Sequence, residues 1–285
     1  IFMNKKKKEQ ILVGKPLIPN AGVRTWYTKE LNDLVAQMDE RTRREVLEIF
    51  RTVAAKGGSV ESQERILLSK LERYYEDLFK RKAKELGQAM VSKQNRSVSA
   101  ALRASIAGFV GQQAFVPVKT FTLSGAVLKD FKGSVNQNVN LIRSLQSEYF
   151  TRIKGAVYRA IIDGQGSGYL RDELLKYGAA GKRRARNIAR DQTHKAYESL
   201  SRARMKEAGL QYWQWEHGGG TKTVRHYHIL DVSKGGLNHS VHKIGEKAYD
   251  EHAVRKKGGS YEGKPVWPGE LPFCTCRMRP VIKFD

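Results

Sequence analysis

The sequence predicts an α+β protein, with a mainly helical N-terminal two thirds and a small mixed or β-rich C-terminal domain. Up to Gly209, apolar residues recur every three or four positions over long stretches, which is typical of amphipathic helices. After Gly209, short apolar runs alternate with Gly, Pro, Asn and Lys, as in strands joined by loops. A chain of 285 residues is also long enough to bury a sizeable core.

Residues 1–22 are predicted to form a basic flexible arm. Lys5 to Lys8 form a charged run, and Pro16, Pro19 and Gly22 follow it. This composition disfavours a packed element and favours an extended tail that is either flexible or ordered by a partner.

Residues 23–115 are predicted to form a helical region, made of a helical hairpin and a third helix. The first helix runs from Arg24 to Lys56 and is stopped by Gly57 and Gly58. Ser59 is a good N-cap for the second helix, whose apolar stripe continues to Leu86. The third helix covers about residues 97–113.

Residues 116–285 are predicted to form the last domain, with helices over 134–209 and a β-rich part over 210–285. The strongest helical pattern runs from Ser134 to Ile162. A short helix then ends at Tyr177, the glycines 178 and 181 interrupt it, and a basic helix runs over 182–208. The alternating aromatic residues of Tyr212 to Trp215 favour a strand with a buried face over a platform for stacking bases.

Positive charge is the strongest compositional feature. The chain has 52 Lys and Arg against 29 Asp and Glu, a formal net charge of +23, which predicts a polyanionic partner such as the phosphate backbone of double-stranded DNA. The excess is concentrated between residues 181 and 209, which hold nine basic and three acidic residues. The predicted DNA-binding residues of this segment are Lys182, Arg183, Arg184, Arg186, Arg190, Arg202, Arg204 and Lys206.

Both cysteines lie near the C-terminal end, at Cys274 and Cys276. A disulfide between them would close a very tight ring, so a reducing compartment is expected. Two interpretations remain open. The two thiols could bind structural zinc together with His226 and His228, because zinc prefers four Cys or His ligands. The favoured interpretation is that they pack as buried thiols and that the protein needs no cofactor.

An enzymatic alternative is a metal-dependent nuclease centred on His226, His228, Asp231 and His252. Such a centre needs carboxylates close to the metal ion, and Asp231, Asp250 and Glu251 could supply them. The sequence has no compact ββα-metal signature, so a non-enzymatic protein is predicted. The most apolar segment, Ala100 to Val118, is interrupted by polar residues, and no stable membrane insertion is expected.

Several motifs occur in an order that suggests a family. Ile188 to Thr193 lie on a predicted helix, Tyr212 to Trp215 on a strand, and Thr223 to Arg225 precede His228. A Pro268-Gly269 turn and the Cys274-Thr275-Cys276-Arg277 sequence close the series. In this order, over about residues 135–283, the chain resembles the head morphogenesis domain of tailed-phage minor head proteins, the Mu protein F-like family.

The resemblance implies a minor head protein that is not an enzyme and has no small-molecule substrate. It would be incorporated in the procapsid near the portal vertex or inner shell, bind packaged viral DNA and be assembled in the host cytoplasm. Ejection with the genome is left open. Portal protein, major capsid protein or scaffold protein would be its partners. We further expect the helices of residues 24–90 to dock on portal or capsid protein through their apolar stripes. A nucleic-acid-binding protein unrelated to phages is a further alternative.

Overall fold

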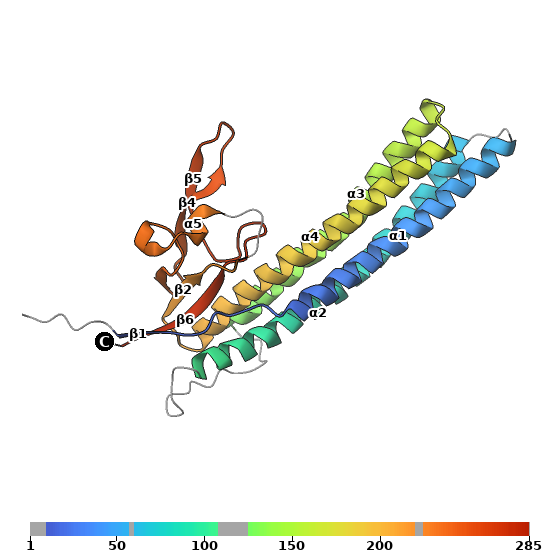
Figure 1. Ribbon diagram of the computed structural model, residues 1–285. Helices are drawn as coiled ribbons and strands as arrows, with labels where there is room; N and C mark the ends of the chain where they lie inside the picture. Colours follow the sequence, from blue (N-terminus) through green and yellow to red (C-terminus); the bar gives the residue numbers. More distant parts are fainter. Residues whose placement is uncertain (1–9, 57–59, 108–124, 220–224, 285) are drawn as a thin grey trace, which may run out of the picture. The chain divides into compact units, whose positions relative to one another are not determined.

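The computed structural model describes residues 10–56, 60–107, 125–219 and 225–284 (Figure 1). It has the α+β class that the sequence predicts, with four long helices before a small antiparallel strand-rich region. The helices and strands are β1 (Gln10–Val13), α1 (Ala21–Lys56), α2 (Val60–Ala107), α3 (Gly125–Ile162), α4 (Ser167–Glu207), β2 (Tyr212–Glu216), α5 (His226–Ile229), β3 (Val241–Lys243), β4 (Ala248–Arg255), β5 (Tyr261–Val266) and β6 (Arg277–Phe284).

The chain forms two compact units that do not follow the predicted linear division into domains. One unit, here called the helical unit, consists of residues 21–90 and 133–192. The other, here called the sheet unit, consists of residues 1–20, 91–132 and 193–285. Three of the long helices therefore contribute residues to both units.

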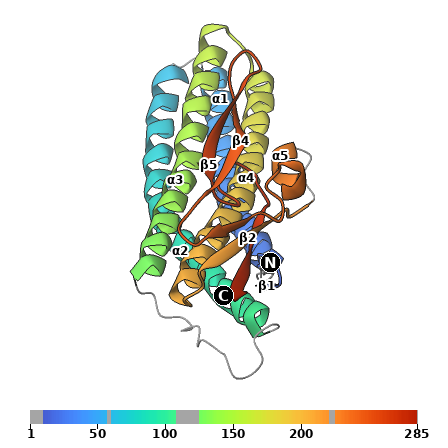
Figure 2. The ribbon, with the colours of Figure 1, turned by 90° about the vertical axis from the view of Figure 1, so that its left-hand side faces the viewer.

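The helical unit is a bundle of α1, the first part of α2, most of α3 and the first part of α4, which run side by side (Figures 1 and 2). Its interior is apolar, with a few polar links between helices. Tyr27 donates a hydrogen bond to Asn138 at 2.8 Å, and Tyr149 donates one to Asp39 at 3.0 Å. The buried apolar residues include Leu31, Val35, Met38, Phe79, Ile142, Phe150, Ile153 and Leu174.

This packing limits the docking surface that we expected on residues 24–90. The apolar stripe of α1, with Leu31, Val35 and Met38, is fully buried within the bundle. Buried side chains cannot also form a surface for portal or capsid protein. A docking surface on this unit would therefore use other residues, such as Ile66 and Tyr74 of α2, whose side chains are exposed.

Two predicted helix breaks are absent from the structure. Residues 60–107 form one continuous helix, α2, where two helices were predicted, and residues 108–113 lie outside the described residues. Residues 167–207 likewise form one helix, α4, without interruption at Gly178 or Gly181. A Cβ atom at Gly178 would overlap the Asp39 carboxylate, and one at Gly181 would approach Val35 to 3.0 Å. These glycines therefore allow close helix packing rather than ending a helix.

The N-terminal segment is not entirely an arm. Strand β1 pairs antiparallel with β6, with Val13 opposite Val281. The pairing is extended by a hydrogen bond from the Leu17 N–H to the carbonyl of Met278 at 3.0 Å, and the Leu17 side chain is fully buried. Residues 10–17 are thus part of the sheet unit, which corrects the prediction of a flexible arm over this stretch. Lys5 to Lys8 lie outside the described residues.

The sheet unit contains a four-stranded sheet in the order β1-β6-β2-β3 and a separate β4-β5 hairpin. Trp213 and Trp215 on β2 are fully buried, which confirms that this strand packs into a core. The ring of Trp267 lies 5.7 Å from that of Trp213. Among the described residues, no helix is both long and apolar enough to span a bilayer.

Candidate functional site

The first five predicted DNA-binding residues lie on α4 in the helical unit. Arg183, Arg186 and Arg190 are exposed, and their spacing of three and four residues places them on one face of the helix. Lys182 is half-buried. Arg184 is also half-buried and forms an ion pair with Glu148, together with a hydrogen bond to the Ser144 hydroxyl at 2.8 Å. We call Arg183, Arg186 and Arg190 the arginine face.

The remaining three residues lie in the sheet unit, where they differ in exposure. Lys206 is exposed. Arg202 is half-buried, pairs with Asp130 at 3.3 Å and places its guanidinium 4.4 Å from the centre of the Trp267 ring. Arg204 is fully buried and donates to the Asn95 side-chain oxygen from Nε at 3.2 Å and from Nη2 at 3.1 Å. Arg204 is therefore an internal residue that DNA cannot reach, which corrects the prediction that it binds DNA.

A cluster of one histidine and two cysteines lies inside the sheet unit. Nδ1 of His228 is 3.5 Å from Sγ of Cys274 and 3.6 Å from Sγ of Cys276. All three residues are buried, and their ligand atoms lie within 4.8 Å of one another. The two cysteines are free thiols. Nitrogen and sulfur ligands at this spacing could hold a soft divalent cation.

The orientation of the His228 ring is set by a buried carboxylate. Nε2 of His228 lies 2.8 Å from Oδ2 of Asp250, which is fully buried on β4. The other oxygen of Asp250 accepts a hydrogen bond from the backbone N–H of His252 at 2.8 Å. In a neutral His228 ring whose Nε2–H donates to Asp250, the lone pair of Nδ1 faces the cysteines.

Three of the four residues in the predicted zinc site are thus brought together, and the fourth is not. His226 is exposed, two residues before His228 on α5, and helical geometry turns the two side chains to different sides. A different histidine lies near the thiols: Nδ1 of His217 is 3.7 Å from Sγ of Cys276. His217 and Asp250 were not part of the predicted zinc site.

The backbone explains the position of His217. It directly follows β2, and Glu216 on β2 pairs with Arg277 on β6, so His217 lies across from Cys276. Gly218 packs so closely on Thr275 that a Cβ atom at this position would overlap the Thr275 carbonyl. Arg277 also donates a hydrogen bond to the carbonyl of Gly218 at 3.2 Å. These contacts hold the histidine beside the thiols.

The ionisable groups of the cluster affect one another. The hydrogen bond between the thiols, together with His228, holds the pKa of Cys274 well below its usual value. The same hydrogen bond, together with burial, raises the pKa of Cys276. Burial lowers the pKa of His228, but hydrogen bonds to Asp250 and Cys274 outweigh it, so the net shift is upward. Burial opposes ionisation of Asp250, yet its hydrogen bonds lower its pKa. Burial lowers the pKa of His217.

The residues of the predicted nuclease centre do not form a single site among the described residues. Asp231 lies 2.6 Å from Nδ1 of His239 and caps the short turn at Ser233. The ring of His252 lies between those of Tyr227 and Tyr261, at 5.5 and 5.0 Å. Neither residue belongs to the cluster of His228 and the two cysteines.

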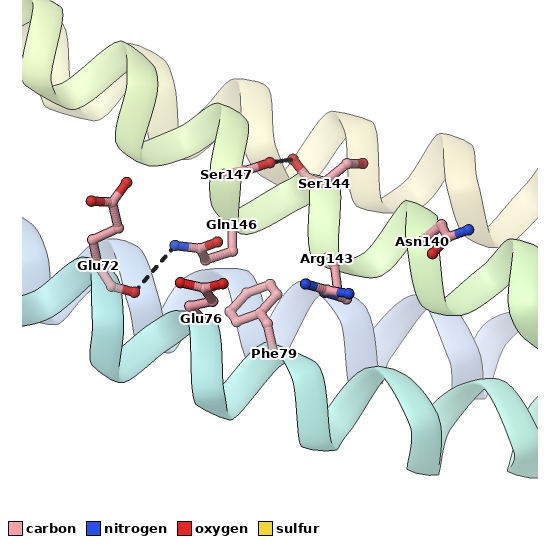
Figure 3. A pocket seen from close by; sticks show the side chains of 8 residues that line it. All are labelled: Glu72, Glu76, Phe79, Asn140, Arg143, Ser144, Gln146 and Ser147. Atoms are coloured by element: carbon pink, nitrogen blue, oxygen red, sulfur yellow. Dashed lines mark hydrogen bonds between the residues drawn. The ribbon is translucent and has the colours of Figure 1, made fainter.

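A hollow of about 370 Å³ lies between α2 and α3 in the helical unit (Figure 3). Its lining carries charges of both signs, including Glu72, Glu76 and Arg143. The Gln146 amide donates across it to the Glu72 carbonyl at 3.3 Å. The lining residues include no Cys or His, so this hollow lacks the ligand chemistry of the cluster described above.

No family model matches the chain. A Haemophilus influenzae protein named "Uncharacterized protein" is 24% identical over 214 residues, which cover 74% of this chain and 47% of that relative. The chain therefore spans about half the length of this curated relative. No solved structure matches.

Proposed function

We propose that this chain is a non-enzymatic minor head protein of a tailed phage, active in head morphogenesis. The observation that carries the proposal is the ordered motif series that resembles the Mu protein F-like family. Its described parts lie on α4, on β2, on α5 and at the start of β6, where Cys274 to Cys276 precede the strand and Arg277 begins it. Thr223 and Val224 of the series lie outside the described residues.

The protein is proposed to bind packaged DNA without sequence preference. Its charge of +23 supports this, since each exposed cation near DNA can replace a condensed counterion. The arginine face supplies three exposed guanidinium groups along one side of α4. Guanidinium groups bind phosphate well but read no base when they contact only the backbone.

The proposed location is the virion head, near the portal vertex or inner shell, after incorporation in the procapsid. Portal protein and capsid or scaffold protein are the proposed partners. Mass spectrometry of purified procapsids and virions from a phage that carries this gene tests the location. We expect the protein in both particles at low copy number. Its absence from both would overturn the proposal, and so would metal-dependent cleavage of plasmid DNA by the pure protein.

The DNA contact is tested by reversing two charges of the arginine face. We expect Arg183→Glu with Arg186→Glu to weaken binding to a random-sequence duplex. The slope of the logarithm of the binding constant against the logarithm of the salt concentration should become shallower by roughly 0.9 for each lost phosphate contact. Fluorescence anisotropy at several salt concentrations measures both. The matched control reverses Lys80 and Arg81, which are exposed on α2 and change the net charge equally. Equal effects of the two pairs would show that the arginine face is not the contact.

A further inference from the structure

We propose that the sheet unit contains a structural zinc site whose ligands are Cys274, Cys276, His228 and His217. The inference depends on the geometry of this cluster and is independent of the proposed role in phage heads. It differs from the ligand set expected from the sequence by one histidine. His217, which follows β2, replaces the exposed His226 of α5.

The first argument is distance. In a tetrahedral zinc site with zinc–sulfur bonds of about 2.3 Å and zinc–nitrogen bonds of about 2.05 Å, neighbouring nitrogen and sulfur ligands lie about 3.6 Å apart. Nδ1 of His228 lies 3.5 Å and 3.6 Å from the two sulfur atoms. Nδ1 of His217 lies 3.7 Å from Sγ of Cys276. Three nitrogen–sulfur separations therefore match those of a zinc site.

The second argument is the orientation of His228. A zinc-bound imidazole usually donates its other N–H to a carboxylate or carbonyl, which fixes the ring. Asp250 fills this role at 2.8 Å from Nε2 and is itself held by the backbone of His252. A buried carboxylate placed behind the ring, on the side away from the thiols, is what a metal-binding histidine needs.

The third argument is charge and burial. Two thiolates and two neutral imidazoles balance the charge of Zn²⁺, so the occupied site would be neutral and could stay buried. Cys274, Cys276 and His228 are all buried. His217 is half-buried at the edge of the cluster, and we infer that the metal draws it in as the fourth ligand.

Such a site would have a clear structural effect. The ligands come from the end of β2, from α5 and from the segment before β6, which are separated by many residues in sequence. Phe273, directly before Cys274, has a left-handed backbone with a φ of 58°, which is costly for a bulky residue. Zinc binding would stabilise this turn and join three segments that are otherwise linked by loops.

The test uses the full chain, purified under reducing conditions. Elemental analysis should find one zinc per chain. After removal of the metal, titration with Co²⁺ should give the strong visible absorption of a tetrahedral thiolate site. A reduced wild-type chain that binds neither metal would overturn the proposal, and so would a weak octahedral cobalt spectrum.

Variants then assign the ligands. We expect Cys276→Ser to abolish the thiolate cobalt spectrum, His217→Ala to weaken metal binding at least tenfold, and Asp250→Asn to weaken it by about 10- to 100-fold. His226→Ala is the matched control and should bind metal like the wild type. If His217→Ala has no effect, or if His226→Ala weakens binding as strongly, the ligand set is wrong. Circular dichroism of each variant shows whether the helices remain folded.

Discussion

The hydroxyl of Tyr149 donates a hydrogen bond to Oδ1 of Asp39 at 3.0 Å inside the helical unit, and this pair lies where α4 packs against α1. Asp39 is buried, which raises the pKa of its carboxyl group. Gly178 on α4 lies directly against this carboxylate, where a Cβ atom has no room. The two polar residues and the glycine therefore form one packed set.

The first prediction is that Gly178→Ala destabilises the protein, although alanine normally favours a helix over glycine by about 1 kcal/mol. The added methyl group would displace the Asp39 carboxylate and break its hydrogen bond to Tyr149. Urea unfolding followed by circular dichroism measures the change. Gly133→Ala on α3 is the control, because nothing lies within 4 Å of the added atom. We expect Gly133→Ala to be neutral or stabilising, and the same result for Gly178→Ala would contradict the packing.

A second prediction concerns pH and Glu64. This residue of α2 is fully buried, and neither carboxylate oxygen has a hydrogen-bond partner among the residues that the structure describes. Burial raises its pKa to about 8 from a usual 4.5. Between these values the folded state holds the proton that the unfolded state has lost. The free energy of unfolding should therefore fall as pH rises through this window, by at most about 1.4 kcal/mol for each pH unit.

Glu64→Gln should remove this contribution. We expect the variant to match the wild type near pH 5 and to become the more stable protein by roughly 2 kcal/mol or more near pH 8. Thermal or denaturant unfolding at pH 5, 7 and 9 measures the difference. Glu76→Gln, at an exposed position of the same helix, is the control and should not alter the pH profile. A Glu64→Gln profile parallel to that of the wild type would show that Glu64 is not protonated in the folded state.

A third prediction separates Arg204 from the DNA-binding residues. Its buried guanidinium donates two hydrogen bonds to the side-chain oxygen of Asn95 and forms an ion pair with Glu207. Arg204→Met would leave these groups without their partner and should cost about 3 kcal/mol in unfolding free energy. Lys206→Ala, at an exposed site two residues away, should change stability by less than about 0.5 kcal/mol. A fully stable Arg204→Met protein would contradict the internal role.

The sequence predicts which stretches are helical more reliably than it predicts whether neighbouring stretches form one continuous helix. The end of α3 at Ile162 was predicted correctly because its apolar pattern is regular up to that residue. α2 was predicted as two helices because buried polar residues interrupt its apolar stripe. Gln94 donates to the Thr193 carbonyl at 3.0 Å, and Asn95 accepts from Arg204. A residue-type pattern cannot show that a polar side chain is buried with a partner distant in sequence.

The candidate metal site was predictable only in part, for a related reason. Cys274 and Cys276 stand out by their spacing, and His228 belongs to the motif series. The nearness of His217 to Cys276 follows from the register that pairs Glu216 with Arg277, and register is a long-range property. The zinc ligand set considered from the sequence contained His226, two residues before His228, and did not contain His217.

The last prediction tests that register at Gly218. A methyl group on this residue would overlap the Thr275 carbonyl, and the loop would have to move away from β6. We expect Gly218→Ala to lower the melting temperature and to weaken metal binding together, because His217 moves with the loop. Gly168→Ala, in the first turn of α4, has open space around the added atom and serves as the control. If the Gly218→Ala variant has the melting temperature and the zinc affinity of the wild type, the loop does not lie against Thr275. His217 then has no fixed place beside Cys276.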